Sequence, residues 1–284
     1  MMPGVSRRVP CVLALAAVLG ACSDDDASHA GGGPGSGGSG GADASSADAG
    51  DADAALEAAL DGAEASEAEA MPPCPADMLL VEDACVDRFE APNVAGALPL
   101  VMYSFDESAA WCAARGKRLC FDDEWTRSCA GPTGSSYPYG DTHVSGTCND
   151  DETWKVYDQS KLNGWPWTVS KPGVESLSQL LDAARAVSAS GKVAADHVEA
   201  LYQAEPSGSN SGCVGPAQVH DLCGNVEEWT RRRDGGAGQD FSGALKGRYW
   251  AEPRTCQNAV TNHGNAFRFY EIGFRCCKDP SAAE

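Results

Sequence analysis

Eleven of the 13 cysteines in this 284-residue chain lie between Cys74 and Cys277, and no other feature constrains the fold as much. In an exported protein, this density of cysteines predicts a framework of disulfide bonds. Because eleven is odd, at least one thiol stays free or pairs outside the chain. Two short apolar runs flank Glu82 and Asp83, which predicts a hairpin closed by a Cys74–Cys85 bridge.

The amino terminus predicts export. Arg7 and Arg8 precede an apolar run at 9–21 that is too short to span a bilayer and is typical of a signal peptide. The run ends in Leu-Gly-Ala-Cys, the pattern of a bacterial lipoprotein cleavage site. We therefore expect residues 1–22 to be a lipoprotein signal peptide and Cys22 to carry the lipid.

The alternative at this end is ordinary secretion with cleavage near Ala21, which leaves Cys22 as a free thiol. A lipid anchor implies a membrane partner and a place in the bacterial cell envelope. Ser23 follows the cysteine where an aspartate could stand, and this favours the outer membrane over the inner one.

Residues 23–73 have the composition of a disordered tether. They contain twelve acidic residues and no Lys or Arg, and Gly, Ser and Ala fill most of the other positions. Such a segment cannot bury enough apolar surface to offset its chain entropy. The net charge of −20 leaves the region from Cys74 onward near −10, which argues against a nucleic-acid partner.

Residues 74–280 have the composition of one globular domain. Ser104 and Glu107 form a capping box, and the helix that they begin should end at Gly116. Asp122 or Asp123 should cap a second helix with Trp125 and Cys129 on its inner face.

Five short motifs occur in an order that resembles the sulfatase-modifying-factor family, whose best-known member is the formylglycine-generating enzyme. The motifs are GKRL at 116–119, DEW at 123–125, YPYG at 137–140, GNVEEW at 224–229 and GFR at 273–275. The resemblance implies an irregular α+β domain, a variant of the C-type lectin-like fold. The cysteines beside these motifs resemble a cysteine-rich bacterial branch, and the resemblance implies a Cys129–Cys276 disulfide.

Relative to the family pattern, residues 155–210 are an insertion. Its apolar spacing predicts two amphipathic helices, which we expect to form a hairpin packed on the domain surface. The residues with this spacing are Leu177, Leu180, Leu181 and Ala184, then Val193, His197, Val198 and Leu201.

The segment 221–228 predicts a structural calcium site. Calcium prefers six to eight oxygen ligands on a sharply turning chain. Asp221 and Glu228 can supply carboxylates, Gly224 and Val226 can supply backbone carbonyls, and the same positions resemble a calcium site of the family. Asn149 resembles a ligand of the family's other calcium, but its partners are not recognisable. The alternative is a turn whose Asp and Glu bond backbone amides.

The segment 246–256 decides the catalytic question. Formylglycine-generating enzymes have two cysteines five residues apart here, which are thought to bind copper(I). Cys256 matches the second, but Ala251 stands at the first, and Arg248 replaces a serine of the family pattern. One thiolate cannot form the two-sulfur site, so sulfatase-oxidising activity is not expected, and Cys256 is a catalytic candidate only if its thiol is free.

A histidine site for iron is not expected either, because His143, His220 and His263 stand singly, without metal-ligand spacing. Two classes of function remain. One is a non-catalytic binding module for an envelope protein or a glycan, held by the acidic tether. The other is an oxidative enzyme of the family, using copper or non-heme iron to modify a protein or small molecule.

Overall fold

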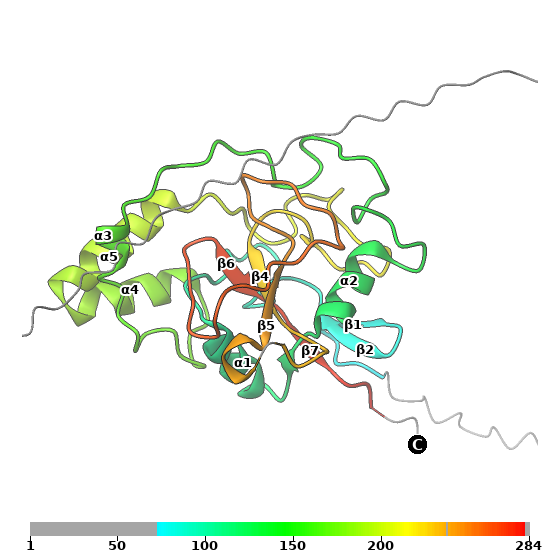
Figure 1. Ribbon diagram of the computed structural model, residues 1–284, viewed down its shortest axis with the longest axis horizontal. Coiled ribbons are helices and arrows are strands. Elements are labelled where there is room, and N and C mark those ends of the chain that lie inside the picture. Colours follow the sequence, from blue (N-terminus) through cyan, green and yellow to red (C-terminus); the bar gives the residue numbers. More distant parts are fainter. Residues whose placement is uncertain (1–72, 237, 282–284) are drawn as a thin grey trace, which may run out of the picture. The chain divides into compact units, whose positions relative to one another are not determined.

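The computed structural model describes residues 73–236 and 238–281 (Figure 1). The predicted signal peptide, the lipidation at Cys22 and the tether at 23–73 lie outside these residues. No helix in the described part of the chain is long and apolar enough to cross a membrane. The described residues form an α+β fold with two small sheets and long irregular connections.

The first sheet has the strand order β1-β2-β7-β3, so its last strand in sequence lies between its earlier ones. β1 and β2 form the predicted hairpin, and a Cys74–Cys85 disulfide closes it as expected. The strands are β1 (Met78–Val81), β2 (Ala84–Asp87), β3 (Arg118–Leu119) and β7 (Cys276–Lys278).

The second sheet has the order β5-β4-β6, with β4 antiparallel to β5 and parallel to β6. Its strands are β4 (Glu227–Arg231), β5 (Gly243–Lys246) and β6 (Ile272–Phe274), and a 3-10 turn, η1 (Gln239–Phe241), precedes β5. Only Arg275 separates β6 from β7, so the two sheets are joined at this fully buried residue.

Two helices pack against the sheets. In α1 (Phe105–Ala113), Ser104 and Glu107 form the predicted capping box, and Gly116 follows with a positive φ of 64°. α2 (Asp122–Ala130) begins where it was expected, but its N-cap is Phe121, whose backbone N–H donates to the Glu124 carboxylate at 2.8 Å. Glu124 therefore stabilises the start of the helix where an aspartate was expected.

The insertion contains α3 (Gln159–Leu162), α4 (Leu177–Val187) and α5 (Ala189–Leu201). The predicted inner face of α4 is buried. On α5, Val193 is 49% exposed, and Ala194, Val198 and Leu201 form the buried face with the spacing of one helical stripe. These residues belong to the main hydrophobic core, so the hairpin is part of the core as well as a surface element.

Five disulfides bind ten of the eleven cysteines from Cys74 onward. The predicted Cys129–Cys276 bridge is wrong, because Cys276 pairs with Cys112 of α1. Neighbouring side chains on a strand point to opposite faces, so Cys277 turns the other way and pairs with Cys120. The remaining bridges are Cys129–Cys256 and Cys148–Cys213.

Candidate functional site

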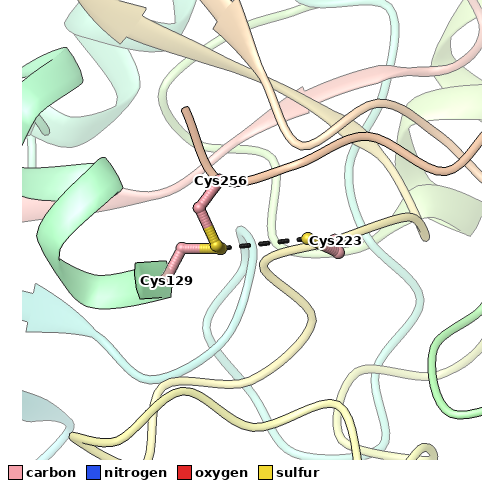
Figure 2. Close-up of side chains that lie close together, drawn as sticks. All are labelled: Cys129, Cys223 and Cys256. Atoms are coloured by element: carbon pink, nitrogen blue, oxygen red, sulfur yellow. Dashed lines mark hydrogen bonds between the residues drawn. A yellow bond between two sulfur atoms is a disulfide. The ribbon is translucent and has the colours of Figure 1, made fainter. Parts of the chain in front are cut away.

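The segment 246–256, where the family resemblance places its reactive cysteines, follows β5. Cys256 lies at its end in a disulfide with Cys129 of α2, and both residues are fully buried (Figure 2). A catalytic role for Cys256 would require a free thiol, and the disulfide shows that Cys256 has none. The first cysteine position is filled by the methyl group of Ala251.

Among the described cysteines, only Cys223 has no disulfide partner. Its Sγ lies 3.8 Å from Cys129 Sγ and 3.3 Å from the Arg254 carbonyl oxygen (Figure 2). Burial raises the pKa of the Cys223 thiol, so the nucleophilic thiolate is disfavoured.

The placement of Cys223 is also poor for disulfide exchange. Its Sγ lies within 4.8 Å of both other sulfurs, so it stands beside the Cys129–Cys256 bond. In-line attack on Cys129 would place it on the extension of that bond, farther from Cys256. The oxidised cluster of Cys129, Cys223 and Cys256 is thus a packed core of sulfur atoms without a poised nucleophile.

Ion pairs join the charged residues that flank Ala251 in the sequence. Arg248 bonds the Glu252 carboxylate and approaches Glu227 Oε1 at 3.3 Å, while Arg254 approaches Glu252 Oε1 at 2.5 Å. Burial raises the pKa of Glu227 to about 7 even though Arg248 opposes the shift. Arg248 stands where the family pattern has a small serine.

A cavity of about 20 Å³ remains beside these residues, lined by Glu227, Arg248, Arg254 and the start of the 258–260 segment. A single water needs roughly 10–15 Å³ by this kind of measure. The cavity therefore has room for about one water.

The turn predicted to bind calcium lies at the junction of the two sheets. Glu228 is fully buried, and Arg275 donates to its two carboxylate oxygens at 2.6 and 2.7 Å. Trp125 Nε1 donates to Glu228 Oε2 at 3.0 Å. Asp221 Oδ2 accepts from the Gly208 backbone N–H at 2.7 Å.

These contacts correct the argument for calcium. It rested on two uncompensated carboxylates, whereas the guanidinium of Arg275 neutralises Glu228. The Arg275–Glu228 pair removes this part of the argument, and calcium binding by Asp221, Gly224, Val226 and Glu228 stays a prediction. The alternative weighed from the sequence, side chains bonding backbone amides, describes Asp221.

A third buried carboxylate, which no sequence motif had marked, completes this cluster. Glu90 accepts from Asn225 Nδ2 and from Ser207 Oγ, both at 2.8 Å. Burial raises the pKa of Glu90 and of Asp221, and Arg275 opposes both shifts. The guanidinium of Arg275 thus bonds Glu228 and also lowers the electrostatic cost of burying Glu90 and Asp221.

Gly224 and Asn149 shape the turn. Gly224 has φ of 73°, and a Cβ there would lie 2.1 Å from the Asn149 carbonyl oxygen, so only glycine fits. That carbonyl accepts from the Asn225 backbone N–H at 2.7 Å, and the Asn149 side chain bonds Asn225 Oδ1 at 3.1 Å. Asn149 therefore acts here as a partner of the turn.

The histidines are dispersed over different partners. His143 Nε2 lies 3.0 Å from Asp150, His220 packs on Phe89, and the ring of His263 stacks on Phe267 at 3.9 Å. Within the described ranges, the one close group of potential metal-binding side chains is Cys129, Cys223 and Cys256. Two of these three are oxidised to a disulfide.

The described architecture agrees with one family of known proteins. A model of the sulfatase-modifying factor enzyme 1-like domain matches residues 51–280, so this chain belongs to that family. The chain is also 28% identical over 189 residues to the inactive C-alpha-formylglycine-generating enzyme 2 of Mus musculus. The match covers 63% of this chain and 48% of the mouse protein, so the chain spans about half of that relative's length.

Two solved structures are loosely similar. CarF is 12% identical, with 74% of this chain and 95% of CarF covered and a TM-score of 0.40. PvdO from Pseudomonas aeruginosa is 16% identical, with 69% of this chain and 80% of PvdO covered and a TM-score of 0.39. At these TM-scores the superpositions carry no argument about function.

Proposed function

We propose that this chain is a member of the family that does not oxidise sulfatases and acts as a binding module. The observation that carries the proposal is the Cys129–Cys256 disulfide, together with Ala251 at the other cysteine position. Both sulfur ligands of the copper site that the family resemblance implies are then missing. The ion pairs of Arg248, which leave a cavity of about 20 Å³, support the same conclusion.

The module would be held in the bacterial cell envelope through a lipid on Cys22, with the acidic segment 23–73 as a spacer. This part of the proposal rests on the sequence pattern at 19–22 and on the composition of the spacer.

Two measurements test the proposal. The mature protein is incubated with copper(I), oxygen, a thiol reductant and a sulfatase-derived peptide that contains the substrate cysteine. We expect no loss of mass at that cysteine, whereas an active formylglycine-generating enzyme, run as a positive control, should convert it to the aldehyde. Peptide mapping without reduction should recover Cys129 linked to Cys256. Aldehyde formation by this chain would contradict the proposal.

A further inference from the structure

A second cavity lies away from the 246–256 segment, between α3 and the chain at 266–269. Its volume is about 280 Å³, and half of its lining residues come from the insertion. This is more than ten times the volume of the cavity beside Arg248. The insertion therefore adds a cleft at a place distinct from the one that the family pattern marks.

Aromatic rings line this cleft. Trp165 is 4% exposed, whereas the neighbouring Trp167 is 70% exposed. Phe267 and Phe269 lie on the other side, with their rings nearly parallel. Hydrophobic and aromatic side chains predominate in the lining of small-molecule sites, and this cleft has four aromatic rings.

The exposed ring of Trp167 is held in place before any ligand arrives. The guanidinium carbon of Arg268 lies 4.7 Å from the centre of the ring, a cation–π contact. Arg268 is itself fixed by Glu107 of α1 at 2.9 Å. The ring is thus supported from the protein core, so a ligand stacking on it immobilises little additional side chain.

Polar groups stand at the rim. Gln159 Nε2 donates to Asn163 Oδ1 at 2.8 Å, and both side chains are exposed and line the cleft. Each amide has a further donor or acceptor, so Gln159 Oε1 can accept and Asn163 Nδ2 can donate. Flat apolar surface beside a few amides suits a ligand with C–H faces and hydroxyl groups.

The charge and size of the cleft limit the class of ligand further. Arg268 is the only charged lining residue, and Glu107 neutralises it. A cationic ligand finds no free carboxylate there, and an anionic ligand meets a chain of net charge −20. A volume near 280 Å³ lies at the lower end for small-molecule sites, which suits one or two rings.

We propose that this cleft binds a neutral sugar ring of a glycan, stacked on Trp167 and hydrogen-bonded by Gln159 and Asn163. The inference rests on the proposed function as a binding module and names its ligand class. The two proposals can be refuted separately. A chain without sugar binding would refute only this inference, whereas aldehyde formation would refute the proposed function.

The test uses the mature protein. Neutral oligosaccharides of glucose, mannose, galactose and N-acetylglucosamine are titrated by calorimetry and by tryptophan fluorescence, with N-acetyltryptophanamide as an apolar comparison. We expect saturable binding of at least one saccharide. Trp167→Ala should weaken it at least tenfold, and Asn163→Ala should weaken it less. Phe241→Ala removes an exposed ring outside the cleft and should leave the affinity unchanged.

Three results would overturn the proposal. They are the absence of binding by every saccharide at millimolar concentration, equal affinity of wild type and Trp167→Ala, and binding of N-acetyltryptophanamide alone. The last would assign the cleft to an apolar side chain of a protein partner. Unchanged thermal melting of Trp167→Ala would show that any lost affinity is not lost folding.

Discussion

Arg275 should stabilise the fold more than its nearest partner, Glu228. Removal of Arg275 leaves Glu228, Asp221 and Glu90 in a buried cluster without the cation that opposes their burial. Removal of Glu228 leaves Arg275 with two acidic neighbours. Arg275 and Glu228 should therefore contribute unequally to the free energy of unfolding.

The contacts set the magnitudes. Arg275→Gln loses both bonds to Glu228 and those to the carbonyls of Asp87 and His220, so we expect a loss of about 3–5 kcal/mol in the free energy of unfolding. Glu228→Gln keeps an oxygen for Trp125 and for Arg275, so we expect about 1.5–3 kcal/mol.

The loss caused by Arg275→Gln should also depend on pH. Without the guanidinium, the pKa values of Asp221 and Glu90 rise further above those of the unfolded chain. The folded variant then retains protons that the unfolded chain releases, so its deficit grows as the pH rises from 5 to 8.

Urea unfolding, followed by tryptophan fluorescence with the disulfides intact, measures these differences. Lys192→Gln breaks an exposed ion pair with Asp196 and should leave the free energy of unfolding nearly unchanged. Equal losses for the two buried variants, or a larger loss for Glu228→Gln, would refute the idea that one guanidinium serves three carboxylates.

Four further outcomes are expected. Burial raises the pKa of Glu271 to about 8 and that of Glu227 to about 7, so stability should fall between pH 5 and 8, and Glu271→Gln should flatten the fall in thermal melts. Joint replacement of Cys129 and Cys256 by alanine opens a loop of 127 residues and should cost up to about 4–5 kcal/mol in urea unfolding; no loss would show that the bridge is dispensable. Millimolar calcium should raise the melting temperature if Asp221 and Glu228 hold the ion, and no rise would identify the turn as a hydrogen-bonded scaffold without calcium. An alkynyl fatty acid should label the wild type and not Cys22→Ala in cells, whereas equal labelling would exclude the anchor.

Local signals in the sequence predicted local structure well. The capping box of Ser104 and Glu107 and the short Cys74–Cys85 loop each need only residues close in the chain, and both are present. The family motifs predicted the α+β fold. The inner face of α2 was also predicted correctly, because Trp125 and Cys129 are both buried there.

Disulfide and ion-pair partners that lie far apart in the sequence could not be predicted from the same signals. Cys276 and Cys277 are adjacent, and their partners depend on which face of β7 each one occupies. The neutralisation of Glu228 by Arg275 depends on the contact of two strands that pair across the second sheet. Arg275 was visible only as part of a motif, and nothing in the motif indicates the charge that it meets.

The position of β7 has a consequence for the order of folding. β7 ends at Lys278, yet it pairs with both β2 and β3, and its two cysteines bind α1 and the end of β3. The first sheet therefore cannot be completed until the chain has been synthesised as far as Lys278. A chain truncated even ten residues early would lose this central strand and two of its bridges. Native structure in this sheet thus forms late in synthesis, and α1 and the residues after β3 stay without these two disulfide bonds until then.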